Sequence, residues 1–202
     1  MTSRYRLGLI AAAVLAIPLF GAAAAIGVPD GTPQYDAGGH LLFPAGYREW
    51  VFLSAGLDMS YSATPAPPGA HTFNNVFAPR TAYEAFLKTG VWPDKTMLML
   101  EVRGGGSNVS IAKGGVVQTG EPLGLEMHVK DTARFKGGWA FFAFNGETPA
   151  DQIAYTASCY SCHQAHAAAD TTFVQFYPTL LPVATQRGTL NPAYVKETAP
   201  AK

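Results

Sequence analysis

Alternating apolar and polar side chains predict several short β-strands across the middle of the chain. The clearest alternation is between Lys95 and Arg103, where even-numbered and odd-numbered residues would occupy opposite faces of a strand. The even face holds Leu98, Leu100 and Val102, and the odd face holds Met97, Met99 and Glu101. By the same reasoning we expect strands at 47–58, 71–77, 95–103, 109–118, 123–130 and 138–144.

One helical segment interrupts these strands. Tyr83, Phe86 and Leu87 stand at i, i+3 and i+4, which predicts a short helix over 81–88, and Gly90 lies where a helix cap is expected. Turn residues rich in glycine separate the strands. Short strands at this spacing are typical of an antiparallel sheet. We therefore expect an α+β fold, mainly antiparallel β-sheet with a few helices near its ends.

The first 25 residues have the pattern of a secretory signal peptide. Arg4 and Arg6 precede an apolar run, and small residues before position 26 fit a cleavage site. An uncleaved membrane anchor is the alternative, because roughly 20 apolar residues suffice to span a bilayer. Either way we expect a periplasmic protein. A lead-in segment at 26–40, one domain at 41–188 and a loose tail at 189–202 would follow.

Composition narrows the classes of function. The 202 residues include 14 basic and 14 acidic side chains, so the formal net charge is zero and no nucleic-acid partner is expected. Removing residues 1–25 would take away two Arg and no acid, which leaves a mildly acidic protein. The chain has only two Cys, three positions apart, which excludes a framework of several disulfides.

These two Cys belong to the segment Cys159-Tyr160-Ser161-Cys162-His163, which has the C-x-x-C-H form of a c-type haem attachment site. Two thiols at this spacing can each form a thioether with one vinyl group of the same porphyrin, and the adjacent His163 can then ligate the iron. The motif therefore predicts one covalently attached haem c near the C-terminus. Cys159 and Cys162 would hold it, and His163 would be the metal ligand.

Two other uses of the Cys pair fit the sequence less well. A thioredoxin-like redox pair normally opens a helix after a strand, near the start of a βαβ unit, and no such alternation precedes this motif. A zinc site would need further ligands. His163 and His166 could supply them, but the resulting cluster would crowd a tetrahedral site.

The sixth iron ligand is an open question at this point. A sixth protein ligand would suit electron transfer, whereas an open position suits gas binding or catalysis. The candidate ligands are Met59, Met97, Met99, Met127, His40, His71, His128 and His166. We expect the three Met on strand faces to pack in the core, and His128 to point to solvent. Small electron-transfer cytochromes usually carry the motif near the N-terminus, so an open sixth position is favoured.

Over roughly residues 40–183 the chain resembles the cytochrome P-460 family, which includes the cytochromes c′-beta. The segments that carry the resemblance are 47–51, 82–83, 88–90, 92–94, 129–131, 134–135, 138–142, 159–163 and 176–178. The resemblance implies an exported, mainly antiparallel β protein that is dimeric and carries one c-type haem with an open distal side. Residues 41–188 would form this haem domain.

The position of one lysine separates two functional branches of that family. Cytochrome P-460 proper oxidises hydroxylamine, and its haem carries an extra covalent bond from a Lys. Leu100 stands at the matching position of this chain, just before the matching Glu101. The resemblance therefore points to the c′-beta branch, whose five-coordinate iron lies beneath an apolar distal pocket that favours NO and CO.

We accordingly expect a gas-binding haem protein for NO, CO or another small nitrogen species, with a homodimer and a redox partner cytochrome as possible assemblies. The candidate distal residues are Phe73, Phe77, Trp92 and Leu100. A hydroxylamine oxidoreductase and an electron-transfer cytochrome with a sixth protein ligand are the alternatives. The nearest acids before the haem motif, Glu147 and Asp151, are expected at the surface, so the sequence identifies no distal acid.

Overall fold

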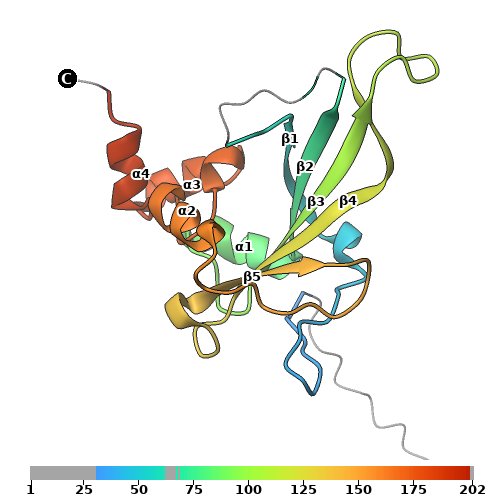
Figure 1. Ribbon diagram of the computed structural model, residues 1–202. Helices are drawn as coiled ribbons and strands as arrows, with labels where there is room; N and C mark the ends of the chain where they lie inside the picture. The colour runs from blue at the N-terminus through green and yellow to red at the C-terminus, as the bar shows by residue number, and fades with distance from the viewer. Residues whose placement is uncertain (1–30, 62–66, 68, 201–202) are drawn as a thin grey trace, which may run out of the picture.

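The computed structural model describes residues 31–61, 67 and 69–200. The expected signal peptide at 1–25 and the first part of the lead-in segment lie outside these residues. Within them the chain forms five strands and four α-helices, which confirms the α+β class (Figure 1). None of the helices in the described part is long and apolar enough to cross a bilayer.

The strands form one antiparallel sheet in which each strand pairs with the next one along the chain, in the order β1-β2-β3-β4-β5. Their bounds are Val51–Leu57, His71–Ala78, Met97–Gly106, Val117–Lys130 and Trp139–Phe144. The expected strands at 71–77, 95–103, 123–130 and 138–144 are confirmed. The one expected at 47–58 begins at Val51, because the residues before it form a 3₁₀ turn.

The strand expected at 109–118 is wrong for most of its length. Positive φ angles at Asn108, Ser110 and Gly115 turn the chain away from the extended conformation that a strand requires. This segment is therefore a loop, and β4 begins only at Val117. The loop projects beyond the sheet between β3 and β4 (Figure 1).

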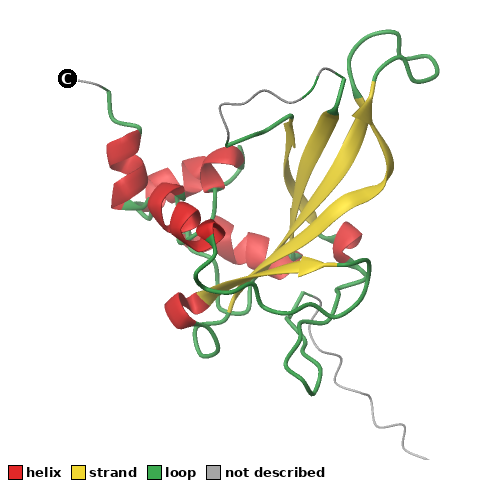
Figure 2. Ribbon diagram, viewed as in Figure 1, coloured by secondary structure: helices red, strands yellow, loops and turns green. Residues whose placement is uncertain are grey.

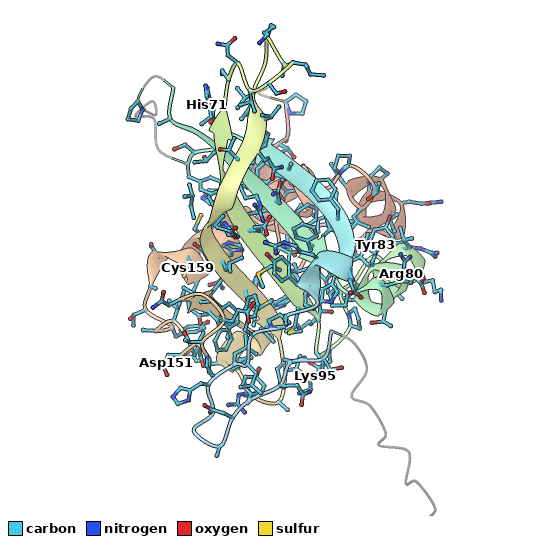
Figure 3. The ribbon with its side chains drawn as sticks, turned by 90° about the vertical axis from the view of Figure 1, so that its right-hand side faces the viewer. His71, Arg80, Tyr83, Lys95, Asp151 and Cys159 are labelled. Atoms are coloured by element: carbon cyan, nitrogen blue, oxygen red, sulfur yellow. The ribbon has the colours of Figure 1, made fainter. Side chains whose placement is uncertain are left out.

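Alternation along the strands places two hydrophobic clusters on opposite faces of the sheet. The α-helices all lie on one side, where Leu98 joins their cluster (Figure 2). The other side faces the viewer in Figure 3. On that side Met97 and Met99 belong to the same cluster as Leu41 of the N-terminal segment. The two faces predicted for 95–103 are thus confirmed.

The helices are α1 (Arg80–Thr89), α2 (Ser158–His166), α3 (Leu181–Arg187) and α4 (Pro192–Glu197), and the 3₁₀ turns are η1 (Tyr47–Glu49), η2 (Lys136–Gly138) and η3 (Val174–Phe176). The expected helix is α1, and Gly90 ends it with a left-handed backbone, φ 73°. A Cβ on Gly90 would lie 2.8 Å from Cβ of Arg187 and 2.7 Å from Oγ1 of Thr189. Both the backbone and the close approach of this later segment therefore require glycine.

The tail expected to be loose at 189–202 is ordered as far as the structure describes it. It contains α4, and Asn191 before that helix donates hydrogen bonds to the carbonyl oxygens of Ala167 (2.8 Å) and Asp170 (2.6 Å). Thr189 donates to the carbonyl oxygen of Gly90 at 2.7 Å. These bonds fasten the tail to the end of α1 and to the segment that follows α2, a tertiary effect that the local composition does not reveal.

Candidate functional site

The C-x-x-C-H motif lies within the first two turns of α2. Cys159 and Cys162 are one turn apart, so their thiols lie on the same side of the helix, and both are half-buried and free of disulfides. Together with His163 they line a cavity of about 710 Å³ between α2 and the sheet. Cofactor sites in proteins have volumes of roughly 300–1,000 Å³. The cavity is therefore large enough for a prosthetic group.

His163 is oriented so that one ring nitrogen is available to a metal. Its Nδ1 lies 2.7 Å from the carbonyl oxygen of Thr171. A carbonyl only accepts hydrogen bonds, so Nδ1 carries the proton and Nε2 does not. Burial lowers the pKa of His163, which keeps the ring neutral at pH 7. A neutral imidazole with a free nitrogen is the form that ligates iron.

Aromatic side chains surround the imidazole of His163. The ring centroid of Phe173 lies 4.1 Å away and that of Phe141 lies 4.7 Å away, and both residues line the cavity. Burial also raises the pKa of the Cys159 thiol, so this thiol stays protonated at neutral pH. The wall formed by α2 is thus a pair of thiols and one imidazole in apolar surroundings.

A row of four paired residues crosses the sheet on the cavity side. Ser54 pairs with Val76, Val76 with Leu100, and Leu100 with Glu126. All four line the cavity. The structure therefore places Leu100 on the cavity wall, between an apolar neighbour on β2 and a carboxylate on β4.

Glu126 was not among the candidates from the sequence. The acids considered there, Glu147 and Asp151, are exposed. One signal could have found Glu126. It occupies an even position of a strand whose odd positions are apolar, and antiparallel pairing with the strand at 95–103 sets it opposite Leu100.

The three aromatic candidates for the distal wall lie elsewhere. Phe77 faces the other side of the sheet, with its centroid 5.7 Å from that of Tyr47 and from that of Phe52. Phe73 is four residues away on the same strand and shares that face. Trp92 packs against Phe86 in the core beneath the helices. None of these three rings lines the cavity, so the expectation that they form the distal wall is wrong.

The expectation that His128 points to solvent is wrong. Its side chain lies in the layer between sheet and helices, with its ring stacked on Phe141 at 4.0 Å and close to Trp139 at 4.4 Å. Its Nε2 lies 3.3 Å from Oγ1 of Thr171. Desolvation lowers the pKa of His128, so its ring is neutral at pH 7. Met127 and Val129, which flank His128 on the strand, are buried on the opposite face of the sheet. Alternation alone therefore suggested that the face of His128 is exposed.

Of the remaining candidates for the sixth iron ligand, only Met59 lines the cavity. Met97, Met99 and Met127 are buried on the sheet face away from the cavity, which confirms their expected place in the core. His40, His71 and His166 pair with carboxylates of Asp36, Asp58 and Glu197. Met59 lines the cavity, and its side chain lies against Gly56, where a Cβ would be 3.2 Å from the sulfur.

A second polar cluster lies behind Leu100, on the sheet face away from the cavity. Its centre is the carboxylate of Glu101, which is only 3 % exposed and accepts hydrogen bonds from Tyr47, Arg48, Arg103 and Asn75. Burial raises the pKa of this carboxyl, but the bonds from Arg103, Tyr47 and Arg48 outweigh burial and lower the pKa to about 2. This cluster ties η1 to the sheet and does not contact the cavity.

The residues of the cavity fit a haem. Two thiols on one side of a helix, a neutral His with Nε2 free and apolar aromatic surroundings meet in a single cavity. A comparison with curated proteins gives no match. The family model described as Cytochrome P460 matches residues 44–174, well over half of the chain. The chain therefore belongs to the cytochrome P460 family, which makes it a haem protein of the P460 type.

Proposed function

We propose that this protein is a periplasmic mono-haem c-type cytochrome that binds NO or a related small gas, as the cytochromes c′-beta do. One observation carries the proposal. Leu100 lies on the cavity wall, at the position where the resemblance expects a cross-linking Lys. Among the described residues that line the cavity there is no lysine at all. A covalent bond from a lysine to the haem is therefore unsupported.

Cys159, Cys162 and His163 would hold the haem. Each thiol would add its S–H across one vinyl C=C bond, which forms a thioether without a leaving group. The hydrogen bond from Nδ1 to Thr171 fixes the ring of His163, and its free Nε2 would be the atom that ligates the iron. When bound, the haem supplies a redox-active iron that can take a diatomic ligand.

The sheet wall would determine what else enters the site. Val76 and Leu100 are apolar and exclude water from the centre of the paired row. Small neutral gases enter such surroundings at little cost, whereas anions lose hydration that apolar side chains do not replace. The His candidates away from α2 do not line the cavity, apart from His128, which shares Thr171 with His163. A second histidine as the sixth ligand of the iron is thus not supported.

The ferrous absorption spectrum with and without CO and NO tests this proposal. We expect the reduced, haem-loaded protein to bind both gases, with spectral changes that saturate at one ligand per haem and no displaced band of a cross-linked haem. Variant Met59→Leu is the matched comparison, because Met59 is the one candidate thioether on the cavity wall. A wild type that binds neither gas until Met59 is replaced would overturn the open site and support an electron carrier.

Glu126 favours a second candidate, hydroxylamine oxidation. Removing electrons from hydroxylamine also releases protons, and a carboxylate in the cavity could accept them. Turnover of hydroxylamine by the wild type with an added electron acceptor would support this candidate, provided that Glu126→Gln slows it at least tenfold. Glu147→Gln is the control, because Glu147 is exposed. Absence of turnover in the wild type would leave gas binding alone.

Export and dimerisation complete the proposal. Export would depend on residues 1–25, and a homodimer is implied by the family resemblance. Exposed apolar side chains in and after the β3–β4 loop support a contact with a second copy, since Ile111 is 92 % and Leu123 is 69 % exposed.

A further inference from the structure

The segment directly after α2 is fastened to the sheet by consecutive residues. Asp170, with a left-handed backbone at φ 51°, forms an ion pair with Lys130 of β4 at 3.1 Å. The next residue, Thr171, meets Nε2 of His128 of the same strand through its hydroxyl at 3.3 Å. Residues 128 and 130 lie on one face of β4. This face of β4 therefore holds two successive residues of the segment.

Thr172 adds a third attachment. Its hydroxyl accepts a hydrogen bond from the indole N–H of Trp92 at 2.9 Å and donates to the carbonyl oxygen of Ala169 at 2.8 Å. Both Trp92 and Thr172 are 1 % exposed. The backbone is thus held on one side of Thr171 by the half-buried ion pair of Asp170 and on the other side by the buried hydroxyl of Thr172.

Thr171 serves both imidazoles of the site. Its carbonyl oxygen accepts the hydrogen bond from Nδ1 of His163, and its hydroxyl meets His128. The two rings lie 5.1 Å apart at 78° to one another. Stacking on Phe141 fixes the plane of His128. A phenylalanine at position 128 could stack equally well, but only a ring nitrogen can bond to the Thr171 hydroxyl.

We infer that His128, acting through Thr171, is a positioning residue for the metal ligand His163, and that it strengthens the hydrogen bond from Nδ1 to the Thr171 carbonyl. This inference rests on the proposed haem site. A metal-bound imidazole whose N–H donates to a well-placed acceptor is a stronger electron donor to the metal. A stronger donor stabilises the ferric state over the ferrous state, which lowers the reduction potential.

Two variants separate this role from simple packing. His128→Phe keeps the stacked ring and removes the nitrogen, and Thr171→Val keeps the shape of the side chain and removes the hydroxyl. We expect each to raise the reduction potential and to move the ferrous iron–histidine stretching band to lower frequency. Because both break the same hydrogen bond, the double variant should shift no further than the larger single effect. Thr171→Ser keeps a hydroxyl and should retain the values of the wild type.

The controls separate this inference from the proposed function. His166→Gln alters an exposed His of the same helix that pairs with Glu197, and it should leave the potential unchanged. If fully haem-loaded His128→Phe and Thr171→Val have the potential of the wild type, the inference is wrong, whatever gases bind. If the wild type carries haem but fails to bind CO and NO, the proposed gas binding is wrong, and the potentials still decide the role of His128. Should His128→Phe fail to fold, Thr171→Val and Thr171→Ser make the same comparison.

Discussion

The buried carboxylate of Glu101 makes the free energy of unfolding depend on pH, and the substitution Glu101→Gln isolates this contribution. The carboxylate is 3 % exposed, and its ordinary pKa of 4.5 is lowered to about 2 in the folded chain. A difference of one pKa unit corresponds to about 1.4 kcal/mol, so ionised Glu101 contributes about 3 kcal/mol to folding. This is a large part of the roughly 5–15 kcal/mol by which domains are stable.

The contribution is complete at neutral pH and is lost in acid. Above about pH 5 the carboxyl is ionised in both states, so the full difference stabilises the folded chain. As the pH falls the unfolded chain takes up the proton first, and the contribution of Glu101 disappears between about pH 5 and pH 2. At pH 3 the linkage relation gives a loss of about 2 kcal/mol.

Urea unfolding of the wild type and of Glu101→Gln at pH 7 and pH 3, in the same haem state, measures this loss. Other carboxyls titrate alike in both proteins, so the wild type should lose about 2 kcal/mol more than the variant over this interval. Glu84→Gln, on the exposed side of α1, is the control and should lose as much as the wild type. Equal losses in the wild type and in Glu101→Gln would refute the reasoning.

Three further variants test the fold, the site and the proposed interface. Gly90→Ala places a Cβ in a left-handed backbone and against Arg187, so we expect a loss of about 1–2 kcal/mol and a lower Tm in thermal unfolding; an unchanged Tm would contradict the account of this cap. Cys159→Ala combined with Cys162→Ala should remove the proposed covalent haem, which intact mass under denaturing conditions detects; a double variant that keeps the haem mass would refute thioether attachment. Ile111→Asp should convert the proposed dimer to a monomer in light scattering, and a variant that stays dimeric would exclude the β3–β4 loop from the interface.

The sequence predicted the sheet well because the strands are strongly periodic. The alternation at 95–103 was clear enough to assign both faces of β3, and the structure confirms them. The failure at 109–118 has a local cause, since Val109 and Ile111 suggest a strand while the backbone around them turns at Asn108 and Ser110. Apolar residues in a projecting loop look like strand residues when no partner strand is considered.

The cavity was harder to predict because it depends on which residues face one another across strands. Leu100 was identified through resemblance, and the structure places it on the cavity wall. Glu126 and His128 were missed as cavity residues because their inward direction follows from pairing of β4 with β3 and β5, not from β4 alone. The segment after α2 shows the same limit, since the contact of Thr171 with His128 joins residues 43 positions apart.

The order of the strands has a consequence for how the protein matures. Because each strand pairs only with its neighbours along the chain, the sheet can assemble stepwise as the chain emerges, without waiting for a distant partner. The thiols of α2 come after all five strands in the chain. The sheet wall that carries Leu100 and Glu126 can therefore form before the Cys159 thiol is available to bond to a haem. Nascent chains truncated after β5 should then already resist proteolysis over the sheet, whereas attachment of the proposed haem would have to wait until α2 has been made.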